Sequence, residues 1–343
     1  MFFKLRFSIF LGVAMFAAML SSPSRALDLQ RAAPQCGATP LRQSALPAAS
    51  AKRLAESQVA EGSRDIAWAW LEAPTLRYPH KSLGSREHAG TVHVQTRLAD
   101  GSLQDIRYEL PLNRVFEDLV PRLVDLDGDG KDELVLVESD LVRGAALVVL
   151  GLRPSPQTQS ASKARNSGKP GAVVLTELAR SPFAGGSFLW LNPLGFGDFD
   201  GDGRTDLAAV ITPHIGGTLT LYHYRPPLLE PFAKAMDVSN HKMGAVEQQL
   251  GVVLPPKSPK SLGPPGLPSS PSERSSIIVP DMTRRALHWL QWGADPQKPA
   301  TQQWNEMSDL MALPARVERM LPSPDGACLH MSDGTWWKLV LPP

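Results

Sequence analysis

Hydrophobic residues recur along most of the chain either at every second position or in short apolar runs. In IAWAWL (66–71) large residues alternate with alanine, whereas ELVLVES (133–139) and GAALVVLGL (144–152) are continuous apolar runs of strand length. Period two and runs this short predict β-strands rather than helices. The dipeptides Asp100-Gly101 and Asp333-Gly334 interrupt such runs in the manner of hairpin turns. We therefore expect an all-β protein.

The order of these elements is repeated within the chain. DLDGDGKDEL begins at Asp125 and DFDGDGRTDL at Asp198, and the same offset of 73 residues aligns Gly144 with Gly217. The repeated unit is therefore a loop, a strand, a turn and a second strand, which is typical of propellers and solenoids. IIVPDMTRRALHWLQW (277–292) repeats the strand, turn and strand, but a Pro/Ser-rich tract precedes it instead of an acidic loop. We expect the C-terminal strands to complete a sheet by pairing with N-terminal strands.

The first 26 residues have the order of a secretory signal. Lys4 and Arg6 precede an apolar run of 14 residues, and the small residues of SSPSRA lead to a cleavage position after Ala26. The apolar run is shorter than the roughly 20 residues of a membrane span, although an uncleaved anchor is the alternative. We therefore predict a secreted or periplasmic protein with a signal peptide at 1–26 and no membrane span after its removal.

The mature chain divides into two parts by composition. Residues 27–62 are rich in Ala, Pro and Ser and form an N-terminal arm, and 63–343 form the main β domain. Two tracts inside that domain, 153–171 and 255–276, have few apolar residues and are predicted to be flexible insertions.

Composition and charge narrow the class of protein. The chain has 343 residues, 43% hydrophobic and 20% charged, with a formal net charge of +1 that becomes −2 when the three cations of the signal are removed. This balance gives no basic surface for nucleic acid. Cys36 and Cys328 are the two cysteines. In an oxidising compartment they would form a disulfide joining the chain ends, and two free thiols are the alternative.

The two acidic stretches have the spacing of metal-binding loops. Oxygen-bearing side chains occupy positions 1, 3, 5 and 9 of each loop, and the glycines between them allow the backbone to curl. Position 7 would contribute its backbone carbonyl. Hard oxygen donors without His or Cys favour Ca²⁺. The candidate ligands are Asp125, Asp127, Asp129, Lys131 and Glu133 in the first loop, and Asp198, Asp200, Asp202, Arg204 and Asp206 in the second.

An EF-hand begins in the same way but requires a Glu at position 12 and flanking helices. Position 12 is Leu136 or Ala209, and the flanking segments have strand patterns. EF-hands and the helix-paired loops of dockerins are therefore excluded.

The stretches PRLVDLDGDGKDELVLV (121–137) and FGDFDGDGRTDLAAV (196–210) resemble the FG-GAP/VCBS repeat family, whose calcium-loop blades also occur in the integrin α-subunit head. The resemblance covers residues 115–224 well and 245–292 weakly. It implies a β-propeller of about five to seven four-stranded blades, with the ten residues named above as ligands of two structural calcium ions. The missing third loop departs from the family pattern.

For function, the resemblance implies a binding or interaction platform for an unknown protein or glycan ligand. A lectin-like propeller is one alternative, because eight Trp residues could stack on sugars, but Trp68, Trp70, Trp190 and Trp289 lie in strand-like runs and are predicted to be core. A propeller hydrolase or lyase using the loop residues His214 and His241 is another. The sequence contains no Ser-His-Asp, HExxH or phosphate-loop pattern that would support an enzyme.

Overall fold

The computed structural model describes residues 27–34, 36, 46–155, 173–256, 274–293 and 303–342. Within these residues it contains 22 β-strands and one short 3₁₀ helix, η1 (Ala48–Lys52), so the protein is all-β as predicted. No helix in this part of the chain has the length and apolar character needed to cross a bilayer. The predicted signal peptide and the central parts of both predicted insertions lie outside the described residues.

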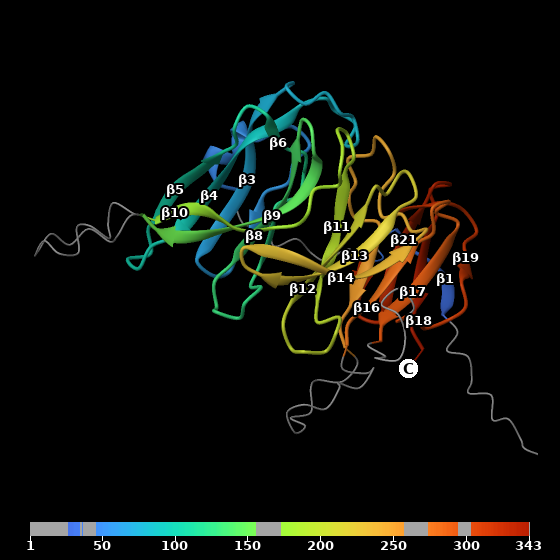
Figure 1. The fold of residues 1–343 in the computed structure, drawn as a ribbon. Helices are drawn as coiled ribbons and strands as arrows, with labels where there is room; N and C mark the ends of the chain where they lie inside the picture. Colours follow the sequence, from blue (N-terminus) through green and yellow to red (C-terminus); the bar gives the residue numbers. More distant parts are fainter. Residues whose placement is uncertain are drawn as a thin grey trace, which may run out of the picture.

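The described strands pair into sheets of 4, 13 and 5 strands, and one parallel pair, β10 with β14, lies within the largest. By their antiparallel pairing we divide these sheets into five units that follow one another along the chain, from blue to red in Figure 1. Unit 1 contains β2 (Ala60–Glu61), β3 (Ile66–Thr75), β4 (His88–Arg97) and β5 (Leu103–Glu109). Unit 2 contains β7 (Arg122–Val124), β8 (Glu133–Asp140), β9 (Gly144–Pro154) and β10 (Val173–Arg180). Unit 3 contains β11 (Leu191–Gly197), β12 (Asp206–Ile211), β13 (Thr218–Arg225) and β14 (Leu228–Met236).

Units 4 and 5 complete the described chain. Unit 4 contains β15 (Val252–Leu254), β16 (Ser276–Pro280) and β17 (Ala286–Trp292), with β18 (Trp304–Glu306) and β19 (Met311–Ala312) both paired to β17. Unit 5 contains β20 (Val317–Ser323), β21 (Gly326–Met331), β22 (Trp336–Val340) and the N-terminal β1 (Asp28–Ala32). The strand, turn and strand predicted at 277–292 and both predicted Asp-Gly hairpins are confirmed.

Strand β1 closes unit 5 from the other end of the chain. It pairs with β22 from Asp28 opposite Val340 to Ala32 opposite Trp336, and in Figure 1 it lies in blue beside the red strands. Cys36 and Cys328 form a disulfide with their Cα atoms 5.6 Å apart. The expected pairing of the chain ends and the disulfide are therefore confirmed, and the segment expected as an arm contributes β1 and β2 to the sheets.

Strands of units 2, 3 and 5 and the segments that lead into units 1 and 4 line one hollow of about 390 Å³. Its walls are formed by residues of β7, β11 and β20 and by residues directly before β2 and β15. The lining residues are Gln58, Val120, Arg122, Pro193, Leu194, Gly195, Phe196, Glu247, Gln248, Gln249, Arg319 and Leu321. This hollow therefore brings together segments that lie far apart along the chain.

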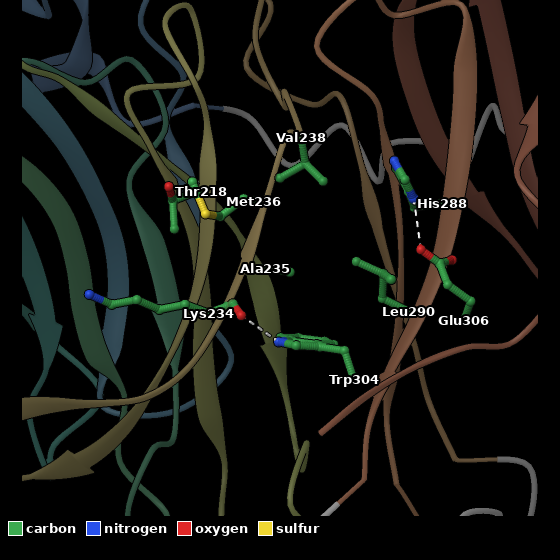
Figure 2. Close-up of a pocket in the computed structure, with 9 residues that line it drawn as sticks. All are labelled: Thr218, Lys234, Ala235, Met236, Val238, His288, Leu290, Trp304 and Glu306. Atoms are coloured by element: carbon green, nitrogen blue, oxygen red, sulfur yellow. Dashed lines mark hydrogen bonds and ion pairs between the residues drawn. The ribbon is translucent and has the colours of Figure 1, made fainter. Parts of the chain in front are cut away.

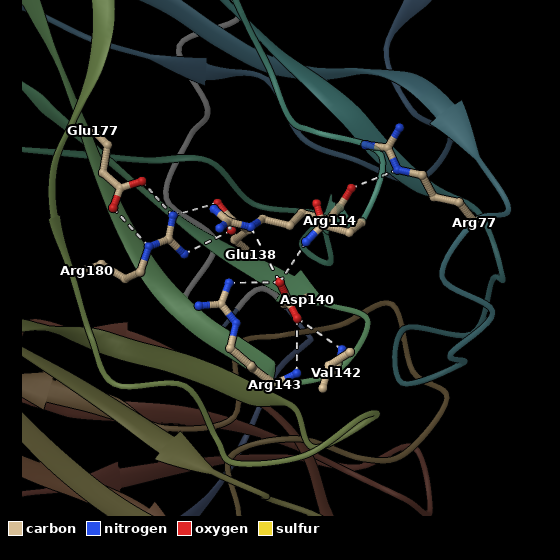
Figure 3. Close-up of polar contacts among 9 residues, drawn as sticks. Arg77, Arg114, Glu138, Asp140, Val142, Arg143, Glu177 and Arg180 are labelled. Carbon is tan, nitrogen blue, oxygen red and sulfur yellow. Dashed lines mark hydrogen bonds and ion pairs between the residues drawn. The ribbon is translucent and has the colours of Figure 1, made fainter.

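A network of buried charges joins units 1 and 2, where the short strand β6 (Arg114–Phe116) pairs with both β4 and β8 (Figure 3). Glu138 on β8 is fully buried and contacts Arg180 on β10 at 2.8 Å and Arg114 on β6 at 3.1 Å. The Arg143 guanidinium beside Asp140 lowers the pKa of that carboxyl. Because these pairs span three strands, they fix the two units against each other.

Hydrophobic packing occurs between units as well as within them. Every residue of β8 is buried, because units on both sides cover this sheet. Burial on both faces explains why ELVLVES is a continuous apolar run rather than an alternating one.

Candidate functional site

The two acidic loops fold identically around their first aspartate. Asp125 accepts hydrogen bonds from the backbone N–H groups of Gly128 at 2.7 Å and Gly130 at 3.0 Å. Asp198 accepts the corresponding two bonds in the second loop at 2.7 and 2.8 Å. The four glycines of the loops have φ between 78° and 92°, a region that favours glycine. Thus the spacing of Asp and Gly in the sequence directly determines the curl of the loop.

Three carboxylates converge in each loop. One oxygen from each of Asp125, Asp127 and Glu133 lies within 4.8 Å of the others, and Asp198, Asp200 and Asp206 make the same group in the second loop.

Two further predicted carboxylates, Asp129 and Asp202, stand at position 5 of each loop. Asp129 and Asp202 are outside these groups and accept the backbone N–H groups of Lys131 and Arg204, both at 2.8 Å. The structure therefore brings together six of the predicted carboxylates as two sets of three.

The carboxyl groups at the ninth position of each loop, Glu133 and Asp206, have raised pKa values, as expected where negative charge gathers around a cation site. Burial, together with the charges of Asp127 and Asp129, raises the pKa of Glu133 to about 7. Burial also raises the pKa of Asp206 to about 7, with Asp200 adding to the effect. Ionising these groups near neutral pH leaves uncompensated negative charge, which a divalent cation would stabilise.

Side chains that the sequence analysis missed adjoin both loops. The buried hydroxyl of Tyr224 has no hydrogen-bond partner within the described residues, and its pKa is raised by burial and by the charges of Glu133 and Asp127. Arg64 lies 3.7 Å from Asp125, whereas His223 lies 3.0 Å from Asp206 in the second loop. These residues come from other strands and loops, so no local motif identifies them.

The donor set suits calcium. All converging side-chain atoms are carboxylate oxygens, the ligands that Ca²⁺ prefers, and an orphaned hydroxyl adjoins the first set.

The two loop histidines of the sequence analysis lie together. His214 Nε2 and His241 Nδ1 are 2.8 Å apart, and His241 Nε2 donates to the carbonyl oxygen of Ala245 at 3.0 Å. Burial lowers the pKa of His214 to about 4 and that of His241 to about 3, so both imidazoles are neutral at physiological pH. Trp190 stacks on His214 with ring centroids 5.8 Å apart.

A third histidine, which the sequence analysis missed, lines the same region. His80 Nδ1 lies 2.6 Å from Glu117, a fully buried carboxylate that also accepts hydrogen bonds from Ser82 and Ser139 at 2.6 and 2.5 Å. His80 and His214 both line a hollow of about 40 Å³. His80 and Glu117 are 37 residues apart in loops without a motif, so their contact could not be read from the sequence.

A larger hollow of about 530 Å³ lies between units 3 and 4 (Figure 2). The indole Nε1 of Trp304 donates to the backbone carbonyl of Lys234 at 2.8 Å and so covers the edge of β14. The Lys234 side chain points away from the other residues in Figure 2, and His288 is paired with Glu306 at 2.9 Å. The walls of this groove are otherwise mainly apolar, and no set of reactive groups converges in it.

Of the eight tryptophans, four are buried (Trp70, Trp190, Trp289 and Trp292) and four are half-buried (Trp68, Trp304, Trp336 and Trp337). Trp70, Trp190 and Trp289 are at most 3% exposed, so they cannot stack on a ligand, and Trp68 is half-buried.

Comparison with known proteins gives no family assignment. No family model and no curated protein matches the chain. Among solved structures, the chain is similar to the crystal structure of BamB from Moraxella catarrhalis, with 14% sequence identity and a TM-score of 0.30. The match covers 82% of this chain and 67% of that one. A likeness at this level does not assign a family, so the functional conclusions depend on the residues described above.

Proposed function

We propose that this protein is an exported, calcium-binding β-propeller that serves as a binding platform, with two calcium ions in a structural role. The observation that carries the proposal is the pair of acidic loops with the same hydrogen bonds at the same positions. A bound calcium ion would neutralise the three converging carboxylates of each loop. The calcium identity and the relationship to FG-GAP/VCBS repeats are parts of this proposal.

Five blades are the number that the described strands support. Strands of units 2, 3 and 5 and the segments leading into units 1 and 4 line one hollow, as blades surround the axis of a propeller. The pairing of β1 with β22 supports closure of the ring in unit 5, since it joins the two ends of the chain.

Export is supported by the disulfide, because such bonds persist in oxidising compartments. A binding role is favoured over the alternatives by the site geometry. The burial of Trp70, Trp190, Trp289 and Trp292 removes half of the tryptophans from a lectin's possible stacking faces. A hydrolase or lyase would have to act in a hollow of about 40 Å³ beside two neutral imidazoles.

Calcium binding can be tested by thermal unfolding with calcium and with a chelator. For a dissociation constant of 10⁻⁴–10⁻³ M, about 10 mM calcium would stabilise each site by roughly 1.4–2.7 kcal/mol. Asp127→Asn and Asp200→Asn should each remove about half of the calcium-dependent rise in Tm. Asp100→Asn is the matched control, since Asp100 also accepts a backbone N–H in an exposed turn but lies outside both loops. A rise in Tm that persists in the double variant would contradict the proposed sites.

A further inference from the structure

The end of the molecule opposite the acidic loops carries a cluster of exposed apolar side chains. The acidic loop precedes β8 and the turn 141–143 follows it, so these two segments lie at opposite ends of the same strand. Val142 in this turn is 75% exposed, and Phe188, Ile215 and Met243 in neighbouring loops are 47%, 74% and 53% exposed. We refer to the loops 76–87, 141–143, 181–190, 212–217 and 239–249 as the loop face.

The loops of this face contact one another directly. Phe188 N donates to the Tyr78 hydroxyl at 2.9 Å, and Gly244 N donates to the carbonyl of Ser82 at 2.8 Å. Ser187 donates its hydroxyl hydrogen to the carbonyl of Leu141 at 2.6 Å. The exposed apolar side chains therefore belong to one continuous surface built from units 1, 2 and 3 and the segment that follows unit 3.

The small hollow opens on this face, and two of the residues that line it have strained backbone conformations. Phe188, Ile215 and Met243 line it together with Thr212. Phe188 and Thr212 have φ of 62° and 49°, a conformation that is unfavourable for aromatic and β-branched residues. Strain of this kind, of about 1–3 kcal/mol per residue, concentrates at binding sites. Here it holds an aromatic ring at the edge of a hollow where it remains exposed.

The polar wall of the hollow offers hydrogen-bond acceptors. Because a carbonyl oxygen can only accept, His241 Nε2 must carry the hydrogen that bonds Ala245. Neutral His241 then accepts at Nδ1, so the hydrogen between the rings belongs to His214 Nε2. This leaves the lone pair of His214 on Nδ1, an atom with no partner within the described part of the chain. An extended peptide supplies matching donors, since its backbone N–H groups are unpaired.

The two ends of the molecule differ in charge. The acidic loops contain nine carboxylates at 125–133 and 198–206 against Lys131 and Arg204. The loop face instead contains five cations against two acids, although Arg143 and Lys242 are paired with acids on adjoining strands. No acidic partner contacts Lys81 or Arg86 within the residues that the structure describes. An acidic partner is therefore attracted to the loop face and repelled by the opposite end.

We propose that the loop face binds an extended acidic segment of a partner protein, with one small aliphatic side chain seated in the hollow between Phe188, Ile215 and Met243. The proposal rests on the proposed function as a binding platform and names the surface and the chemistry of the partner. A hollow of about 40 Å³ accepts a short aliphatic group, and the surrounding apolar rim supplies the remaining contact area.

The test is fluorescence anisotropy with short labelled peptides and the full-length protein. One peptide set carries a single valine flanked by aspartate and glutamate, a second replaces the acids by lysine, and a third replaces the valine by asparagine. We expect the acidic valine set to bind at least about tenfold more tightly than either of the others. Ile215→Asp should weaken this binding by about tenfold, since it places a charge at the rim. Leu103→Asp is the matched control, because Leu103 is 47% exposed at the start of β5, at the end away from the hollow.

A second variant separates binding from folding. Phe188→Asn should weaken peptide binding without lowering Tm, because asparagine tolerates positive φ. The proposal is overturned if the lysine set binds equally well, if no set binds, or if Leu103→Asp has the same effect as Ile215→Asp. Binding to vesicles of mixed phosphatidylcholine and phosphatidylglycerol, but not to the peptides, would also overturn it and indicate a membrane surface. Calcium-dependent melting of the same samples reports separately on the proposed metal sites.

Discussion

Gly144 and Gly217 occupy equivalent positions in the two repeats, in the turn between the second and third strands of a unit, and both pack against the segment that leads to the next unit. A Cβ added at Gly144 would overlap the carbonyl oxygen of Gly186 and lie 2.8 Å from that of Leu189, whereas ordinary Cβ contacts lie at 3.4–4 Å. A Cβ at Gly217 would overlap the carbonyl oxygen of Val238. Both obstacles are backbone atoms, which cannot rotate away as a flexible side chain can. We therefore predict that alanine at either position loosens the joint between units.

Three alanine variants separate the two effects that would lower the free energy of unfolding: the backbone penalty of positive φ and the crowding of an added Cβ. Gly101→Ala introduces a side chain at φ 83° with no atom within 4 Å, so it measures the backbone penalty alone, about 1 kcal/mol. Gly217→Ala meets crowding without positive φ and should cost about 1–3 kcal/mol. Gly144→Ala has φ 78° as well as the crowding, so its cost should approach the sum, roughly 2–4 kcal/mol.

Urea unfolding followed by tryptophan fluorescence measures these differences, and the buried Trp190 lies directly after Leu189 in the joint. The expected order of destabilisation is Gly144→Ala, then Gly217→Ala, then Gly101→Ala. Equal losses for Gly144→Ala and Gly101→Ala would refute the reasoning, since they would show that the close approach of the two units contributes nothing.

Three further predictions concern charge and cross-linking. Because burial raises the pKa values of Glu133 and Asp206 from 4.5 and 3.8 to about 7, their contribution to stability is present at acid pH and is lost as pH rises from about 4 to about 7, by up to roughly 3–4 kcal/mol each. In chelator, the Tm should therefore fall as the pH rises from about 4 to about 7, and calcium should reverse the fall. The double variant Glu133→Gln, Asp206→Asn should have a flatter profile of Tm against pH, whereas a flat profile in the wild type would contradict this assignment. Replacing Cys36 and Cys328 by alanine should cost about 5 kcal/mol in urea unfolding, since the disulfide closes a loop of 292 residues; unchanged stability would show that strand pairing alone holds the ends. Arg180→Met leaves buried Glu138 with Arg114 as its remaining ion pair and should cost about 3–5 kcal/mol, whereas Arg143→Met, at a side chain 47% exposed, should cost below about 1 kcal/mol; similar losses in calorimetry would contradict the distinction.

The features that sequence analysis predicted are those determined by local spacing. Alternating aspartate and glycine specify the loop curl, because each carboxylate bonds a backbone N–H two to five residues further on. The Asp-Gly hairpins and the strand pattern of β3 and β4 depend on neighbouring residues in the same way. The 73-residue offset also predicted that β8 and β12 begin at equivalent positions.

The remaining features depend on contacts between distant segments. Tyr224 approaches the first acidic loop from another unit, and His80 contacts Glu117 across 37 residues. Neither pair has a spacing that any local rule describes. The predicted roles of Asp129 and Asp202 followed from spacing alone and stay predictions; both accept a backbone hydrogen bond, as Asp127 and Asp200 also do.

The pairing of β1 with β22 also has a consequence for the order in which the molecule can be assembled. During synthesis β1 emerges before every other described strand, and its partner emerges after all of them. Unit 5 must therefore remain incomplete until the ribosome has made residue 340. A chain that terminates before β21 leaves Cys36 without the thiol to which it is joined in the complete protein. The free thiol of Cys36 would thus mark unfinished molecules, and its loss would mark the moment at which the two ends of the chain meet.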